Sequence, residues 1–136
     1  MPLFIVDTNV ISYALRHDTR AALYARYLRD QSLAISFATL TELLFGARKR
    51  NWGARRLHDL DVLLRPYLVL YPDEASCRVW AEVIWQCERV GRPISENDAW
   101  IAACALRFDA SLVTHNHKDF EAVPDLRIIS ENESFA

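Results

Sequence analysis

The stretch of sequence that decides the fold is Leu3-Phe4-Ile5-Val6-Asp7-Thr8-Asn9. Its four apolar residues do not alternate with polar ones, which is typical of a short strand buried on both faces of a sheet. Asp7 follows directly, and Thr8 or Asn9 can cap a helix that begins there. The stretch therefore predicts a carboxylate at the carboxyl end of a central parallel strand, the edge where open α/β sheets place ligands.

The size and composition of the chain fit one domain, which we expect to span residues 1–136. The sequence is 51% hydrophobic and 25% charged, enough for an apolar core. No apolar run approaches the roughly 20 residues that cross a bilayer, and no signal-peptide layout is present, so we expect a cytoplasmic protein without membrane contact. Cys77, Cys87 and Cys104 lack paired spacing and lie among apolar neighbours, which indicates reduced core residues.

Short apolar runs and helical patterns alternate along the rest of the chain. The apolar runs predict strands over residues 33–36, 68–70, 112–114 and, at a sheet edge, 126–129. Helical spacing predicts helices over residues 10–15, 22–28, about 39–47, 57–64, 75–90 and 99–108. We expect Asp18 or Thr19 to cap the second of these helices and Asp73 to cap the fifth. This alternation predicts an α/β fold with helices on both faces of a mostly parallel sheet. We expect the acidic tail after Ser130 to fray.

Four carboxylates stand near predicted strand-to-helix junctions. Asp7 ends the first strand, and three acids each follow a potential cap by three residues: Glu42 after Thr39, Asp98 after Ser95 and Asp119 after Asn116. This spacing is that of a capping box, so helix capping is one explanation for each acid. Because such junctions of a parallel sheet share one edge, the four acids can also converge on one point.

Converging carboxylates require a compensating charge. Asp98 begins a helix that is apolar almost all round, and a buried carboxylate needs a partner or a metal ion. Neighbouring carboxylates also raise one another's pKa unless a cation neutralises them. Oxygen ligands without Cys or clustered His favour Mg²⁺, with Mn²⁺ as a substitute, over zinc. The chemistry that this arrangement predicts is phosphodiester hydrolysis by metal-activated water.

Four motifs occur in order over nearly the whole chain: Ile5-Val6-Asp7-Thr8-Asn9, Thr41-Glu42-Leu43 with Gly46-Ala47, Asn97-Asp98 with Ile101-Ala102-Ala103, and Thr114-His115-Asn116 with Asp119-Phe120. In these motifs the sequence resembles the PIN-domain ribonucleases, specifically the VapC-type toxins of bacterial toxin–antitoxin modules. The resemblance implies a three-layer α/β/α PIN-like fold and a magnesium-dependent endoribonuclease that is the toxin of a VapBC system. It implies RNA as substrate, a cognate antitoxin as partner and a homodimer held by apolar helix faces.

The resemblance also assigns residues. It implies that the catalytic carboxylates, which are also the metal ligands, are Asp7, Glu42, Asp98 and Asp119. It implies that the supporting polar residues are Thr8, Thr114 and Asn116.

The most basic segment of the chain spans residues 48–56, at a predicted helix break with Gly53 as terminator. Fourteen of the sixteen Lys and Arg residues in the whole chain are Arg, which suits bidentate phosphate contacts. The segment predicts RNA contacts by Arg48, Lys49, Arg50, Arg55 and Arg56, with Trp52 as a stacking platform. A solvated helix end is the alternative. His115 and His117 lie in a turn that suits solvated residues rather than metal ligands.

Two other functions compete with this one. A response-regulator receiver has similar size, sheet and acid-plus-magnesium pocket, but it needs a phosphoacceptor Asp on a middle strand and a Lys at the last. Residues 68–71 supply no acceptor, and the only lysines are Lys49 and Lys118. A PIN adaptor that binds RNA or protein without cutting is the second alternative, and the four intact acids argue against it.

Overall fold

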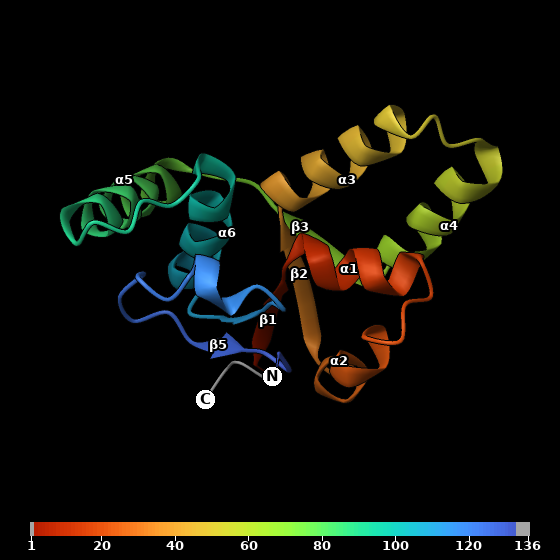
Figure 1. Ribbon diagram of the computed structural model, residues 1–136, viewed down its shortest axis with the longest axis horizontal. Helices are drawn as coiled ribbons and strands as arrows, with labels where there is room; N and C mark the ends of the chain where they lie inside the picture. The colour runs from red at the N-terminus through yellow and green to blue at the C-terminus, as the bar shows by residue number, and fades with distance from the viewer. Residues whose placement is uncertain (1, 133–136) are drawn as a thin grey trace.

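A five-stranded parallel sheet organises the computed structural model, which describes residues 2–132. Within this range β1 (Leu3–Val6) is central, between β2 (Ser32–Ser36) and β4 (Ser111–Val113). The edge strands are β3 (Tyr67–Leu70) and β5 (Ile128–Ile129), which gives the order β3-β2-β1-β4-β5. Helices lie on both faces of the sheet (Figure 1). The predicted α/β fold with a central parallel sheet is confirmed, including the edge position of the last strand.

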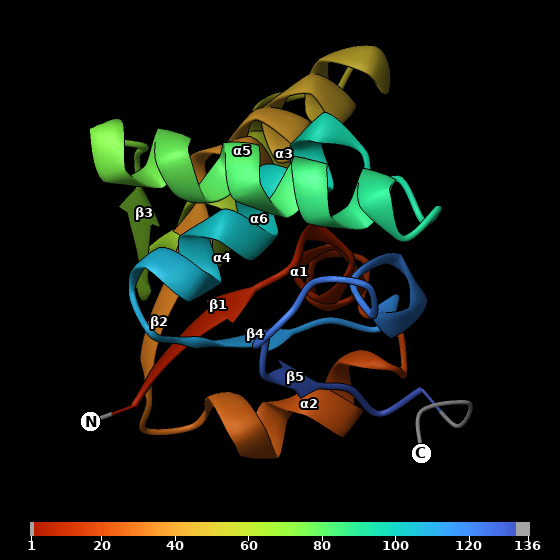
Figure 2. The same ribbon diagram turned by 90° about the vertical axis from the view of Figure 1, so that its left-hand side faces the viewer.

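Two apolar clusters, one on each face, explain the unbroken apolar run of β1. Ile5 packs into a cluster with α5 (Glu74–Arg89) and α6 (Glu96–Arg107), and Val6 packs into the opposite cluster with α1 (Thr8–Leu15), α2 (Ala21–Leu28) and α4 (Ala54–Leu64). Both side chains are fully buried. Figure 2 shows α5 and α6 on one side of the strands and α2 on the other. Because successive strand residues point to opposite faces, a strand covered on both must be apolar throughout.

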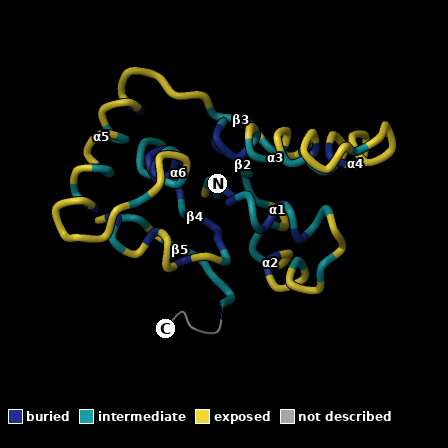
Figure 3. Tube along the Cα trace, turned by 45° about the horizontal axis from the view of Figure 1, so that its top comes forward, coloured by how far each residue is buried: buried dark blue, intermediate teal, exposed yellow. Residues whose placement is uncertain are grey.

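The third helix, α3 (Phe37–Lys49), extends away from the sheet and forms a helical hairpin with α4. In Figure 3 the outer surfaces of both helices are largely exposed. The turn between them carries Gly53, which is the N-cap of α4 and not the terminator of the preceding helix. α3 ends earlier, with Arg50 as its C-cap: the backbone N–H of Arg50 donates to the carbonyl of Gly46 at 3.0 Å, and that of Asn51 donates to the carbonyl of Arg48 at 3.1 Å.

Four predicted helix caps are wrong, including that of α1, where Asp7 takes the position predicted for Thr8 or Asn9. α3 begins at Phe37 because Ser36 caps it, accepting from Ala38 N at 3.1 Å, so Thr39 is not a cap and Glu42 lies beyond the first turn. α2 begins after Arg20 and has no side-chain cap, so neither Asp18 nor Thr19 takes that role. Asn116 precedes only the 3₁₀ turn η1 (His117–Asp119) and makes no capping bond.

Other capping predictions hold. Ser95 caps α6 by accepting from Asp98 N at 3.1 Å, and Asp73 caps α5 by accepting from Ser76 N at 2.8 Å. The cap of α1 is Asp7 itself, which accepts from Thr8 N at 2.7 Å; neither Thr8 nor Asn9 takes that position.

Burial corrects one expectation about the cysteines. All three are free thiols, and Cys87 and Cys104 lie in the core, but Cys77 is exposed on the outer face of α5. Of the tail, Glu131 and Asn132 are hydrogen-bonded to the body of the protein and are not frayed, while residues 133–136 lie outside the described range. None of the helices within residues 2–132 is long and apolar enough to cross a bilayer.

Candidate functional site

The four predicted acids lie near one another at the carboxyl edge of the sheet. Asp7 follows β1, Glu42 lies on α3 after β2, Asp98 lies in the first turn of α6, and Asp119 ends η1 after β4. The negative charge of Glu42 raises the pKa of Asp7, and the charges of Asp7 and Asp119 raise that of Asp98. The structure therefore brings together four side chains that are up to 112 positions apart in the sequence, Asp7 to Asp119.

Asp7 is the most buried of the four, with 5% of its surface exposed. Burial raises the pKa of its carboxyl group to about 6, against the lowering effect of hydrogen bonds from Thr114 and Thr8. Its Oδ1 accepts from Thr8 N at 2.7 Å, and its Oδ2 accepts from Thr114 Oγ1 at 2.7 Å and from Asn9 Nδ2 at 3.0 Å. Three donors from two strand ends thus fix the orientation of this carboxylate.

Asp98 is half-buried, and partial burial is the main cause that raises its pKa to about 6. The charges of Asp7 and Asp119 raise the pKa further, and a hydrogen bond from Ser95 lowers it. No Lys or Arg side chain of residues 2–132 forms an ion pair with any of the four acids. The negative charge of the cluster is therefore uncompensated by the basic side chains of this range.

Glu42 and Asp119 complete the cluster from opposite sides. Glu42 is half-buried, its Oε1 accepts from Thr8 Oγ1 at 3.1 Å, and its pKa is raised by burial and by the charge of Asp98. Asp119 is exposed. The cluster is thus closed on the β1 side and open to solvent on the η1 side.

The predicted supporting residues contact the acids in different ways. Thr8 binds Glu42, and the fully buried Thr114 binds Asp7. Asn116 contributes its backbone, because its N–H donates to Thr114 Oγ1 at 3.0 Å. One residue was missed: Asn9 donates to Asp7 and accepts from His115 N at 3.1 Å. Its place two residues after the acid is a usable signal, but that place also suits a helix cap.

The donor chemistry of the cluster fits a hard divalent cation. The available ligands are carboxylate and hydroxyl oxygens. Asp7, Glu42 and Asp98 have raised pKa values and no ion-pair partner among the Lys and Arg residues described. Within the described part of the chain, no group of three or more His, Cys, Asp or Glu side chains lies close enough together to hold a metal ion by itself. Mg²⁺ usually retains several waters and takes only one or two carboxylates directly, so an open set of acids suits it better than a closed cage would.

Two grooves flank the acids, and both are lined with cations. One, of about 580 Å³, passes Thr8 and Glu42 and is bordered by Arg16, Arg20, Arg50 and Arg56. The other, of about 360 Å³, contains Asp98 and Asp119 together with Arg92 and Lys118.

The residues of the predicted basic segment do not all line the same groove. Arg50 and Arg56 line the larger groove, and Arg55 lines a neighbouring hollow with Trp52. Arg48 and Lys49 are exposed and line neither groove. The guanidinium of Arg56 lies over the ring of Trp52, 5.5 Å from its centre, so one face of this predicted stacking platform is already occupied.

The two histidines of the turn are not solvated, which corrects the expectation from the sequence. His117 is 1% exposed, and its Nδ1 lies 2.7 Å from Glu121 Oε1. His115 is half-buried, and its Nδ1 lies 2.5 Å from the hydroxyl of Tyr24. Neither ring bonds to the four acids in these contacts; both fasten the segment that follows β4.

The sequence of this chain is similar to known proteins over most of its length. Residues 4–126 match the PIN domain family. The chain is 33% identical over 127 residues to Ribonuclease VapC1 of Haemophilus influenzae (strain R2866), covering 92% of this chain and 95% of that protein. It is 29% identical over 124 residues to the tRNA(fMet)-specific endonuclease VapC of Shigella flexneri, covering 91% and 94%.

Solved structures show the same similarity in three dimensions. VapBC-1 from nontypeable Haemophilus influenzae has a chain that superposes with a TM-score of 0.81 at 32% identity, covering 94% of this chain and 97% of that one. DNA-bound VapBC from Salmonella typhimurium gives a TM-score of 0.85 at 27% identity, covering 96% and 98%.

Proposed function

Because this chain belongs to the PIN-domain family, and within it to the VapC-type ribonuclease toxins, we propose that it is an endoribonuclease that depends on Mg²⁺, with Mn²⁺ as a substitute. Its catalytic and metal-binding residues are Asp7, Glu42, Asp98 and Asp119, in one PIN domain over residues 1–136. The observation that carries the proposal is the cluster of four coupled carboxylates without a Lys or Arg partner among the described residues. A bound Mg²⁺ would neutralise these charges and lower the pKa of an attacking water.

Hydrogen bonds from neighbouring residues orient the carboxylates of Asp7 and Glu42. Asp7 is held by Thr8, Asn9 and Thr114, so its carboxylate is fixed before any ligand binds. Glu42 is positioned by Thr8 from the opposite side. Fixed oxygen ligands avoid reorganisation during the reaction, which is the main way in which such sites stabilise developing charge. In the reaction, a water oxygen bonds to phosphorus while the phosphorus–oxygen bond to the leaving nucleotide breaks.

The two grooves give the proposed path of the RNA strand. Arg16, Arg50 and Arg56 on one side, and Arg92 and Lys118 on the other, place positive charge on both sides of the acids. A strand that crosses the cluster would contact phosphates in both grooves while the scissile phosphate lies over the carboxylates. We assign weaker roles to Arg48, Lys49 and Arg55, which line neither of the two grooves.

We also propose two protein partners. The solved structures that share this fold at 27% and 32% identity are of VapBC from Salmonella typhimurium and VapBC-1 from Haemophilus influenzae, which supports a cognate antitoxin for this chain. The exposed apolar side chains of the hairpin support a homodimer; they are Leu44, Phe45, Leu57 and Val62. Apolar side chains clustered on one surface usually mark such contacts.

Incubation of the purified protein with total RNA tests the activity. We expect new RNA ends with Mg²⁺ or Mn²⁺ and none with a chelator, and we expect none from Asp98→Asn in any condition. Retention of RNA on the protein without any cleavage would instead support a non-cutting PIN adaptor.

A further inference from the structure

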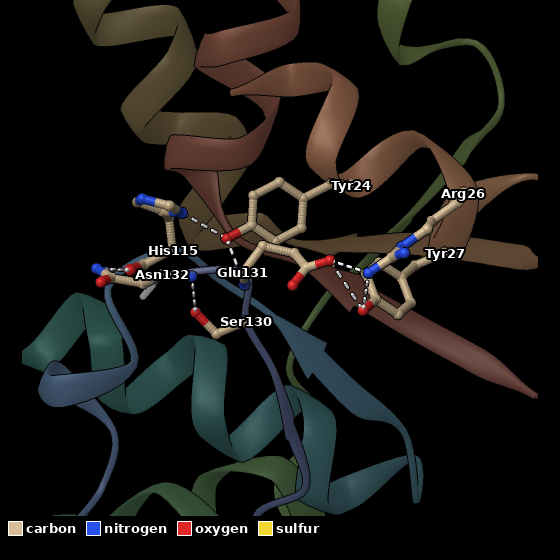
Figure 4. Close-up of polar contacts among 7 residues, drawn as sticks. All are labelled: Tyr24, Arg26, Tyr27, His115, Ser130, Glu131 and Asn132. Atoms are coloured by element: carbon tan, nitrogen blue, oxygen red, sulfur yellow. Dashed lines mark hydrogen bonds and ion pairs between the residues drawn. The ribbon is translucent and has the colours of Figure 1, made fainter. Parts of the chain in front are cut away.

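A hydrogen-bonded chain links the C-terminal segment to α2 and to the segment after β4 (Figure 4). The hydroxyl of Tyr24 on α2 lies 2.5 Å from His115 Nδ1, and it accepts from Glu131 N at 3.0 Å. The Tyr24 side chain is fully buried. Three segments that are distant in the sequence thus meet at one hydroxyl group.

One of these two hydrogen bonds has a fixed direction, because Tyr24 Oη accepts the backbone N–H of Glu131. In the bond to His115, Tyr24 donates its own proton when Nδ1 is the unprotonated ring nitrogen. A neutral ring is consistent with burial, which lowers the pKa of His115. The ring also makes edge contacts with Tyr13 and Tyr24, at 5.5 and 5.8 Å between centres.

The backbone of His115 carries this link into the acid cluster. Its N–H donates to Asn9 Oδ1 at 3.1 Å, and Asn9 Nδ2 donates to Asp7 Oδ2 at 3.0 Å. Its carbonyl accepts from Asn132 Nδ2 at 3.0 Å. The ring, the N–H and the C=O of His115 are therefore all held, between residues that contact the acid cluster and residues of the C-terminal segment.

We propose that Tyr24 and His115 are positioning residues, which lock the segment of residues 114–119 against the end of β1 and so fix Asn9, Thr114 and Asp119 for catalysis. This inference rests on the proposed ribonuclease function. The C-terminal residues Glu131 and Asn132 add two hydrogen bonds, from the backbone N–H of Glu131 to Tyr24 and from the side-chain amide of Asn132 to the carbonyl of His115. We call this set of hydrogen bonds around Tyr24 and His115 the lock. Neither positioning side chain needs to touch RNA or metal, because each acts through the backbone of residues 114–119.

Removal of one hydroxyl group tests the proposal. In Tyr24→Phe the buried ring remains, and we expect kcat for RNA cleavage to fall about tenfold or more, with KM within about twofold of its original value. His115→Ala should have the same effect, and the double variant should be no worse than either single variant. His115→Asn retains an acceptor near the position of Nδ1 and should recover most of the lost kcat.

Tyr27→Phe is the matched control. Tyr27 is on the same helix, and its hydroxyl donates to Glu131 Oε1 at 3.1 Å, but it does not contact His115. We expect its kcat to remain unchanged. An unchanged kcat in Tyr24→Phe, or equal losses in Tyr24→Phe and Tyr27→Phe, would overturn the proposal.

A measurement without RNA separates this proposal from the proposed function. In the metal-free protein, Tyr24→Phe should speed amide hydrogen exchange at His115 and Asn116, and Tyr27→Phe should not. If the wild-type protein cleaves no RNA, the proposed function fails, while faster exchange still supports the lock. Exchange that is identical in wild type and Tyr24→Phe would refute the lock whatever the activity.

Discussion

Thr114 Oγ1 donates to Asp7 Oδ2 at 2.7 Å and joins the ends of the neighbouring strands β4 and β1 across 107 positions of sequence. Both side chains are buried. This bond opposes the effect of burial, because a hydrogen bond to the charged carboxylate lowers its pKa. Asp7 therefore depends on Thr114 both for orientation and for its charge near neutral pH.

Thr114→Val keeps the shape of the side chain and removes this hydrogen bond. We expect the pKa of Asp7 to rise further, so that the acid limb of the cleavage profile moves to higher pH and kcat falls more at pH 6 than at pH 8. Rates measured from pH 5 to 9 check this. Thr114→Ser, which retains the hydroxyl, should restore the original profile, and an unshifted acid limb in Thr114→Val would contradict the prediction.

Asp98→Asn removes one of the mutually repelling charges and preserves the side-chain shape. We expect metal-dependent RNA cleavage to be lost, while the melting temperature of the metal-free protein stays the same or rises. Circular dichroism melts and an RNA assay on the same preparation measure both. Asp61→Asn, at an exposed position on α4, is the control and should leave cleavage intact. Full activity in Asp98→Asn would refute the site assignment.

The metal-free protein should lose stability as the pH rises. Asp7 and Asp98 have pKa values of about 6 in the folded protein, above the ordinary 3.8, so the folded state binds more protons than the unfolded state between these values. The free energy of unfolding should therefore fall from about pH 4 to pH 6 and then level off. For the buried Asp7 the loss is on the order of 3 kcal/mol at most, and it is smaller for the half-exposed Asp98.

Urea unfolding with a chelator at pH 5 and pH 7.5 checks this prediction. The protein should be less stable at pH 7.5, the difference should shrink in Asp98→Asn, and added Mg²⁺ should stabilise the wild type more at pH 7.5 than at pH 5. Equal stability at both pH values would show that these acids are not destabilised by burial and repulsion.

The two arginines that line the larger groove should contribute to RNA affinity rather than to the chemical step. In Arg50→Glu with Arg56→Glu, we expect weaker binding and a shallower salt dependence, by roughly 0.7 in the log–log slope for each phosphate of single-stranded RNA that the variant no longer binds. Cleavage at saturating RNA should change little. Arg48→Glu with Lys49→Glu changes the charge equally outside the groove and should have the smaller effect. Equal effects of the two pairs would indicate nonspecific attraction.

The exposed apolar surface of the hairpin should hold a homodimer. Phe45 is 67% exposed on α3, and Phe45→Asp should convert a dimer into a monomer in light scattering at micromolar concentration. Trp85→Asp, at a position 54% exposed on α5, is the control and should remain dimeric. A monomeric wild-type protein under these conditions would contradict the prediction.

The strands and most helices were predictable from the sequence because their signals are local. Each strand is a short apolar run, and Ser95 and Asp73 precede their helices by the spacing that capping requires. The start of α3 was not predictable, because Ser36, Thr39 and Thr41 all lie close to the junction. The cap is the residue at which β2 ends, and that point is set by pairing with β1 and β3.

The sequence also did not predict which individual polar or weakly apolar side chains are buried. Cys77 and Cys87 lie on the same helix, yet only Cys87 faces α6 and the core. His117 is buried because η1 turns it inward, where Glu121 lies beside its ring. Both outcomes depend on how a segment is rotated against its neighbours, which a short pattern of few apolar residues does not specify.

The sequence by itself determined that carboxylates would follow buried parallel strands, because an unbroken apolar run and the acid after it are properties of adjacent residues. Only the tertiary structure decided how those acids are held and charged. The order of the strands places β4 beside β1, and this brings Thr114 to Asp7 and His115 to Asn9. Tyr24 reaches His115 across 91 positions because α2 packs beneath the same strands. Such hydrogen bonds, and the pKa values that burial raises, exist only once distant segments have excluded water from one another.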